Sequence, residues 1–193
     1  MRVLTYLASL ALALTTFAAN AAEMTYKDVP KSKGVPAYTI VWISGDIEKG
    51  DHSKFANFVS KRNRVMVVLD SPGGLLNEGL NIGLLIRQKA FATAVYNECV
   101  SVCGLMWLAG TYRVVSTEAK IGFHAAYRVE NDKPIEDGSG NAFVGRYLTV
   151  LNFSWEAIEF LTSAAPDSVE WLNGVKAKKF GITASVYDPK KKS

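Results

Sequence analysis

The chain has 193 residues, with 22 Lys and Arg, 18 Asp and Glu, and a formal net charge of +4. Much of the positive excess lies near the ends, at Lys27, Lys31 and Lys33 and at residues 190–192, and no aromatic residues alternate with it. Nucleic-acid binding favours a basic stripe interleaved with aromatic residues, so we expect no nucleic-acid partner.

The first 21 residues have the pattern of a bacterial secretory signal peptide. Arg2 supplies a positive charge, residues 3–17 are mostly apolar, and Ala19-Asn20-Ala21 is a small-x-small cleavage site. An uncleaved anchor helix is the alternative, but a bilayer span needs about 20 apolar residues and this run is shorter. We therefore expect cleavage after Ala21, a periplasmic protein, and no membrane span in the mature chain.

The rest of the chain, about 170 residues, is long enough for one domain with a sizeable core. Residues 22–37 contain two prolines, a glycine and several lysines, and predict a flexible leader. Residues 38–187 predict the folded domain, and residues 188–193 form a basic tail.

The first half of this domain alternates strands with helices. β-branched, aromatic and apolar runs predict strands at 38–44, 64–69, 91–96, 112–115 and 120–123. Apolar residues at helical spacing predict helices at 51–61 and 75–88, and the uniformly apolar run 101–109 predicts a buried helix. This order is typical of an α/β protein with a mostly parallel sheet.

The second half reads as mainly helical. Residues 130–141 contain Asp, Pro and Gly and predict a surface loop, followed by helices at 142–151 and 155–162. Asp167 is expected to cap one more short helix, and the chain then passes through 174–180 to a last strand at 183–187.

Cys99 and Cys103 are the two cysteines of the chain. Four residues apart on a helix, their Cα atoms would lie about 6 Å apart, within the range of a disulfide. We favour a disulfide because the expected compartment is oxidising; two small buried thiols are the alternative. The two histidines lie far apart in sequence and no second cysteine pair exists, so we expect no metal site and no cofactor.

Three features of the central stretch suit acyl transfer, which needs a nucleophile, a base and oxyanion donors. Ser101 precedes the buried helix, where the N–H of Val102 is a natural oxyanion donor. Gly73 and Gly74 follow the strand 64–69, and either backbone N–H would serve as the second donor. His124 follows the strand 120–123. Each residue also has a simpler explanation, as a helix cap, a turn or a structural histidine; their shared place at the strand ends favours a site.

Three motifs together resemble the proteolytic subunit of the Clp protease. They are Ser71-Pro72-Gly73-Gly74, a serine heading a helix that ends Leu108-Ala109-Gly110, and a strand ending at His124. This family belongs to the ClpP/crotonase superfold. The pattern Cys-x-Ser-x-Cys and Ala165-Pro166-Asp167 further resemble a group of exported bacterial ClpP-like proteins. The resemblance covers residues 38–187 and implies repeated ββα-type units with a C-terminal helical region.

The resemblance implies a serine peptidase with Ser101 as nucleophile, His124 as general base and peptide or unfolded-protein substrates. Asp167 is the first candidate for the acid of the triad and also reads as a helix N-cap, while Asp70 is a lesser candidate. The resemblance further implies a homo-oligomer built through residues 142–164. No ATPase partner is expected outside the cytoplasm.

Two other functions remain open from the sequence. A catalytically silent ClpP-like module would use Ser101 as a helix cap only, and the bulky Val100 and Val102 beside it favour that alternative. A crotonase-type thioester enzyme would share the paired oxyanion donors, but coenzyme A thioesters are not expected in the periplasm.

Overall fold

The computed structural model of the protein describes residues 22–191. The predicted signal peptide lies outside these residues. The strands, in chain order, are β1 (Glu23–Val29), β2 (Tyr38–Ser44), β3 (Val65–Ser71), β4 (Ala92–Val100), β5 (Tyr112–Ser116), β6 (Lys120–Phe123), β7 (Tyr127–Glu130), β8 (Lys133–Glu136), β9 (Glu170–Leu172) and β10 (Ser185–Tyr187). The helices are α1 (Asp51–Val59), α2 (Leu76–Gln88), α3 (Val102–Leu108), α4 (Gly138–Val150), α5 (Trp155–Thr162) and α6 (Gly174–Lys179).

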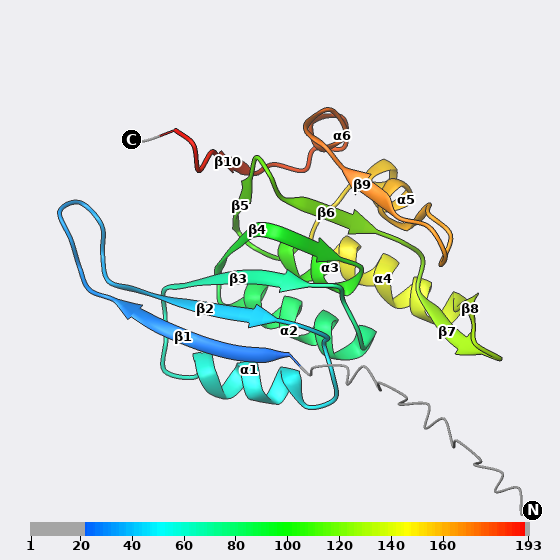
Figure 1. Ribbon diagram of the computed structural model, residues 1–193, viewed down its shortest axis with the longest axis horizontal. Helices are drawn as coiled ribbons and strands as arrows, with labels where there is room; N and C mark the ends of the chain where they lie inside the picture. The colour runs from blue at the N-terminus through cyan, green and yellow to red at the C-terminus, as the bar shows by residue number, and fades with distance from the viewer. Residues whose placement is uncertain (1–21, 192–193) are drawn as a thin grey trace, which may run out of the picture.

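Within the described residues, one eight-stranded sheet runs in the order β1-β2-β3-β4-β5-β10, with β6 branching from β4 and β9 pairing with β6 (Figure 1). Strands β2 to β5 pair in parallel, and β4 pairs with β5 along its first half and with β6 near its end. The pairing of β3 with β4 shifts register between Leu69 and Ser71, just before both strands end. The prediction of an α/β fold with a mostly parallel sheet is confirmed.

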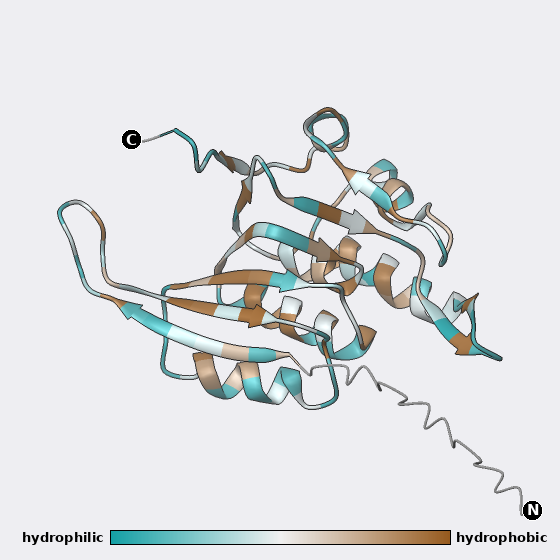
Figure 2. Cartoon of the chain, viewed as in Figure 1, coloured by the Kyte–Doolittle hydropathy of each residue, from teal (hydrophilic) through white to brown (hydrophobic). Residues whose placement is uncertain are grey.

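The core lies between this sheet and helices α1, α2 and α3, which pack beside one another against it. Val67 and Leu69 on β3 are fully buried, as are Phe55 on α1, Ile82 on α2 and Met106 on α3. Figure 2 shows the same division, because β2 and β3 are mostly hydrophobic whereas β1 is largely hydrophilic. The predicted strands and helices of residues 38–123 are all present, with ends that differ by a few residues.

The segment expected to be a flexible leader is instead ordered, and this expectation was wrong for most of its length. Strand β1 pairs antiparallel with β2 along all seven residues, from Glu23 opposite Ser44 to Val29 opposite Tyr38. Ala22 and Met24 are buried in the core. Both prolines, Gly34, Lys31 and Lys33 belong to the turn between the two strands, and only Lys27 lies on β1 itself.

The expected surface loop at 130–141 was also wrong. Strands β7 and β8 form a two-stranded hairpin whose turn residues, Asn131 and Asp132, have positive φ values of 50° and 58°. Two such residues suit a tight hairpin turn. Helix α4 then begins at Gly138, earlier than predicted, because the Asp137 side chain accepts a hydrogen bond from the backbone N–H of Ser139 and caps the helix.

Candidate active site

A cleft of about 630 Å³ opens beyond the ends of β2, β3, β4 and β6. In a parallel sheet these carboxyl ends meet at one edge, which is where such folds bind ligands. Ser101, His124 and Gly74 all line the cleft, so the structure brings the sequence-predicted nucleophile, base and glycine turn together. The other lining residues are Asp46, Ile47, Glu48, Lys49, Pro72, Leu75, Leu76, Ala126, Tyr127 and Asp137.

Ser101 is the single residue between the end of β4 and the start of α3. Its backbone has φ 61° and ψ −130°, a left-handed conformation that costs a non-glycine residue about 1–3 kcal/mol. Its N–H donates to the carbonyl oxygen of Gly122 at 2.9 Å, which ties the turn to β6. The side chain does not cap α3, so the structure does not support a capping role. Ser101 is half-buried and lines the cleft.

Cys99 and Cys103 form a disulfide, with 5.2 Å between their Cα atoms, and the favoured prediction is confirmed. Cys99 lies in β4 and Cys103 in α3, so the bond joins the two elements that meet at Ser101. Both cysteines are fully buried. The disulfide therefore closes a short loop with Ser101 at its centre.

The glycine turn packs directly against this loop. Gly73 has φ 112°, and a Cβ atom there would lie 2.7 Å from the Cβ of Ser101, so no larger residue fits. Its N–H already donates to the Ser71 hydroxyl at 3.0 Å. The turn is held to Ile47 by two backbone hydrogen bonds, from Ile47 N–H to Gly73 and from Leu75 N–H to Ile47, each 2.7 Å long.

Gly74 and Val102 are the predicted oxyanion donors that this geometry favours. Ile47 and Gly74 form an isolated parallel β-bridge, in which Gly73 and Leu75 make the hydrogen bonds to Ile47. The N–H of Gly74 therefore points away from Ile47. Val102 is the first residue of α3, and an N–H at that position has no acceptor within its helix. Gly73 contributes the close approach to Ser101 rather than a free donor.

His124 follows β6 and is half-buried at the cleft. Its Nδ1 lies 2.8 Å from the carbonyl oxygen of Ala125. A carbonyl only accepts, so this contact requires a proton on Nδ1 and leaves Nε2 as the basic nitrogen. The N–H of Ala125 donates to Ala164 at 2.8 Å, which fixes the backbone beside the histidine. Ser101 and His124 also line a small apolar crevice with Leu105, together with Leu76, Val102, Phe123, Ala126, Val144 and Leu161.

The candidate acids from the sequence do not line this cleft. Asp167 is exposed in a turn in which the N–H of Ser168 donates to the carbonyl oxygen of Ala165. No helix begins there, so the expected helix cap was wrong. Asp70 accepts a hydrogen bond from the Asn97 side chain at 2.9 Å. Neither carboxylate contacts His124 through any hydrogen bond or ion pair of residues 22–191.

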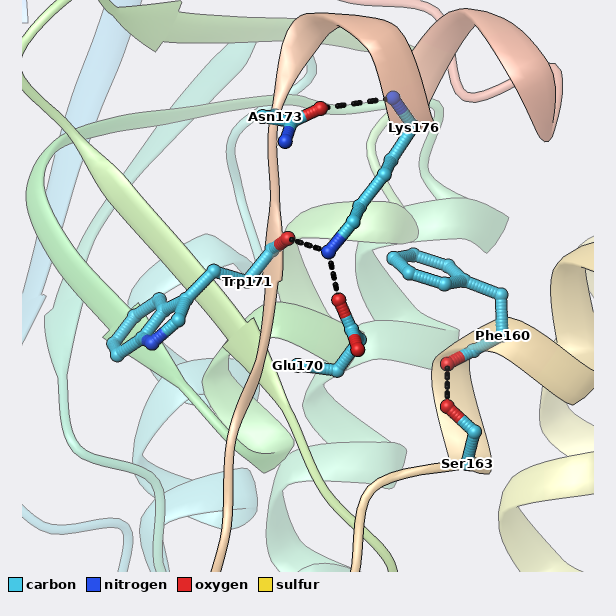
Figure 3. Close-up of polar contacts among 6 residues, drawn as sticks. All are labelled: Phe160, Ser163, Glu170, Trp171, Asn173 and Lys176. Carbon is cyan, nitrogen blue, oxygen red and sulfur yellow. Dashed lines mark hydrogen bonds and ion pairs between the residues drawn. The ribbon is translucent and has the colours of Figure 1, made fainter.

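The next carboxylate along the chain, Glu170 on β9, is engaged elsewhere. Figure 3 shows the Lys176 ammonium donating to the Glu170 carboxylate and to the Trp171 carbonyl oxygen. Glu170 lies opposite Phe123 on β6, and directly opposite residues share one face of a sheet. Successive side chains of a strand point to opposite faces of the sheet. The Glu170 side chain therefore lies on the face of Phe123, opposite to the face of the next residue, His124.

Three carboxylates of the cleft were missed by the sequence reasoning. Asp46 and Glu48 lie in the turn after β2, and Asp137 caps α4 on the wall that also carries Tyr127. All three are half-buried, and none forms an ion pair within residues 22–191. Asp46 and Glu48 were recognisable as acidic residues directly after a parallel strand. Asp137 was not, because the sequence predicts a surface loop at 130–141.

Two other kinds of feature are missing from the described part of the chain. No group of three or more His, Cys, Asp or Glu side chains there is arranged to hold a metal ion. None of its helices combines the length and apolar character needed to cross a bilayer.

Comparison with family models gives no match, and comparison with curated proteins gives none either. Several solved structures share the fold. A membrane-bound, stomatin-specific protease superposes with a TM-score of 0.59 at 18% identity, covering 76% of this chain and 77% of that one. The ClpP catalytic domain from Plasmodium falciparum gives 0.58 at 20% identity, covering 80% and 87%. A ClpP1 variant from Listeria monocytogenes gives 0.60 at 19% identity, covering 78% and 92%. The ClpP-like fold implied by the sequence resemblance is confirmed.

Proposed function

We propose that the protein is an exported, ATP-independent serine peptidase that hydrolyses peptide bonds. The observation that carries this proposal is the left-handed backbone of Ser101 at a strand-to-helix turn, in one cleft with His124. Strain of this kind persists where it serves a purpose, and here it supports a serine that shares a cleft with an imidazole and the glycine turn.

The proposed reaction follows from the arrangement of these groups. Nε2 of His124 takes the hydroxyl proton while Oγ of Ser101 bonds to the carbonyl carbon of the peptide. The carbonyl oxygen becomes an oxyanion, which accepts hydrogen bonds from the N–H groups of Gly74 and Val102. His124 then gives its proton to the leaving amine, and water hydrolyses the acyl-serine by the same steps in reverse.

The orientation of His124 is the part of the proposal in which the backbone replaces a side chain. In a serine triad a carboxylate binds Nδ1–H and holds the tautomer. The Ala125 carbonyl oxygen makes that contact in this protein. A neutral carbonyl stabilises the imidazolium less than a carboxylate does, so we expect slower turnover than with a full triad. Asp167, the acid proposed from the sequence, contributes only if it moves toward His124 on substrate binding.

The structural neighbours support peptides as the substrate class. Two of them are ClpP proteases, and the stomatin-specific protease is also known in complex with a substrate peptide. Export is supported by the signal-peptide pattern of residues 1–21 together with the disulfide, a bond typical of oxidising compartments. A periplasmic location in turn argues against an ATP-driven partner.

Self-association is the other component of this proposal. Of the apolar residues on the helices expected to mediate it, Val144, Tyr147, Leu148 and Leu151 are buried in the chain's own core. Phe143 and Val150 on α4 are exposed, and Trp155 at the start of α5 is 79% exposed. These remaining residues support a contact between copies, which light scattering after gel filtration tests directly.

The decisive experiment is labelling with a fluorophosphonate, which reacts with activated serines. Intact mass should show one adduct on the full mature chain and none on Ser101→Ala. Ser53→Ala is the matched control, because Ser53 is exposed on α1 and lies outside the cleft, and it should label normally. Labelling that persists in Ser101→Ala would remove Ser101 from the mechanism.

A catalytically silent binding or assembly module is the second candidate. The observation that favours it is the lack of a carboxylate on His124 among the described residues. No labelling of a well-folded protein, either oxidised or reduced, would support this alternative and contradict the peptidase.

A further inference from the structure

Five exposed cations gather at the end of the sheet that lies opposite the cleft. Lys27 lies on β1, Lys31 and Lys33 lie in the turn between β1 and β2, and Lys61 and Arg64 lie between α1 and β3. We call these five residues the basic end. Figure 1 shows the β1–β2 turn projecting beyond the body of the sheet on this side.

The basic end is held together by backbone contacts rather than formed by two independent loops. The N–H of Thr39, at the start of β2, donates to the carbonyl oxygen of Arg64 at 2.9 Å. The projecting turn is closed by two hydrogen bonds between Ser32 and Val35, each 3.0 Å long. An open groove of about 680 Å³ lies between the two segments and is lined by residues of both.

The charge of the basic end is not neutralised within the described chain. Its one acidic neighbour, Asp28, accepts a hydrogen bond from the Thr39 hydroxyl at 2.6 Å and lies 3.6 Å from the Arg62 guanidinium. None of the five cations forms an ion pair with any of residues 22–191. The five cations therefore favour an external anionic surface as their partner.

The side chains around the cations favour a lipid surface over a nucleic acid. Next to the tip of the projecting turn, Val35 is 46% exposed between Gly34 and Pro36, and it offers an aliphatic group to a headgroup layer. Bases of a nucleic acid would stack on aromatic rings. Of the two rings beside the cations, Tyr26 is covered by the Arg62 guanidinium at 3.9 Å from its centroid, and Tyr38 is half-buried in the wall of the groove.

We propose that the basic end, Lys27, Lys31, Lys33, Lys61 and Arg64, binds the surface of an anionic phospholipid bilayer. The binding is peripheral and electrostatic, because the cations lie on the headgroup plane and only the tip of the β1–β2 turn enters it. The cleft lies at the carboxyl ends of the same strands, so it faces away from the bilayer and stays open. This inference does not depend on the peptidase proposal.

The test is sedimentation of the mature protein with two kinds of vesicle. Pure phosphatidylcholine provides a neutral surface, and phosphatidylcholine containing about one third phosphatidylglycerol provides an anionic one. We expect binding to the anionic vesicles only, weakened at least tenfold between ~0.1 M and ~0.5 M salt, because counter-ions screen the attraction. The triple variant Lys31→Gln, Lys33→Gln, Lys61→Gln should bind at least tenfold more weakly.

A second triple variant removes the same charge elsewhere. Lys120, Lys133 and Lys179 are exposed on β6, on β8 and at the end of α6, and changing all three to Gln should leave vesicle binding within twofold of the parent. Equal losses in both variants would show a net-charge effect and overturn the proposal. So would equal binding to neutral vesicles, or binding of a short DNA duplex in the absence of any vesicle binding.

Discussion

At the scale of single residues, the conformation of Ser101 argues against a role as a helix cap alone. A serine heading a helix is usually a cap, and the sequence alone left that alternative open. The structure gives Ser101 a left-handed backbone and no capping hydrogen bond. The same position would be less strained as glycine, and that difference is measurable.

Replacing Ser101 with glycine should raise the free energy of unfolding by about 1 kcal/mol, because glycine adopts a positive φ without strain. Ser101→Ala keeps the Cβ atom and should change stability little. Urea denaturation of both variants measures the difference. A glycine variant no more stable than the alanine variant would mean that Ser101 is not strained.

His124 and Asp167, the base and the acid expected from the sequence, should respond very differently to substitution. His124→Gln should lower kcat/KM on a peptide substrate by about a thousandfold, because it removes the general base. Asp167→Asn should leave kcat/KM within about twofold, since Asp167 is exposed outside the cleft. A loss of a hundredfold or more in Asp167→Asn would instead restore Asp167 as the acid of a full triad.

At the scale of elements, the packing of α2 on α3 sets the position of Ser101. A Cβ atom at Gly79 on α2 would lie 2.3 Å from Cγ2 of Val102, the residue after the serine. Val102 is β-branched and has little freedom to move aside. The bulky valine that raised doubt about the site in the sequence is therefore matched by a glycine on the neighbouring helix.

Gly79→Ala should consequently destabilise the protein by about 1–2 kcal/mol, even though alanine favours helices by ~1 kcal/mol over glycine. Adding Val102→Ala should restore part of the lost stability, because it removes the clashing methyl groups. It should also restore part of the peptidase activity that the displaced Ser101 loses in Gly79→Ala. Denaturation of the single and double variants gives the coupling energy. Strictly additive effects would show that the two residues do not contact each other.

The elements that the sequence predicted and those it did not differ in what stabilises them. The parallel strands and helices of residues 38–123 bury continuous or periodic apolar runs, so their identity is visible locally. β1 carries mostly exposed residues and is a strand because β2 offers it an edge. The β7–β8 hairpin is likewise exposed throughout, and its signal was limited to the pair Asn131-Asp132.

The candidate site divides in the same way. Ser101, His124 and the glycine turn follow strands whose order was readable, so their convergence was predictable. The contact of His124 with a backbone carbonyl was not, because no side-chain pattern records it. Asp137 escaped notice because its place in the cleft depends on the hairpin before it.

At the scale of the whole molecule, the charges of the two ends of the sheet are opposite. The cleft end holds Asp46, Glu48 and Asp137 against a single Lys49, so its walls are net negative. The far end is basic. A peptide substrate with basic residues is therefore complementary to the walls that surround Ser101.

Matched peptides differing only by Arg or Glu beside the scissile bond should show this preference. We expect kcat/KM to favour the Arg peptide by about tenfold at low salt and by less at high salt, because salt screens exposed charges. The double variant Asp46→Asn, Glu48→Gln should reduce the ratio toward one. An unchanged ratio in that variant would place the origin of any preference elsewhere.

If the basic end rests on a bilayer, the length of the parallel strands sets the distance between the cleft and the lipid surface. β3 has seven residues and runs from Val65 beside the basic end to Ser71 beside the cleft. At about 3.3 Å per residue it holds the cleft roughly 23 Å from the end that contacts lipid. A substrate anchored in the same bilayer would be reached only by a segment standing at that height. The sheet would then act as a ruler, selecting the cleavage position by distance from the membrane.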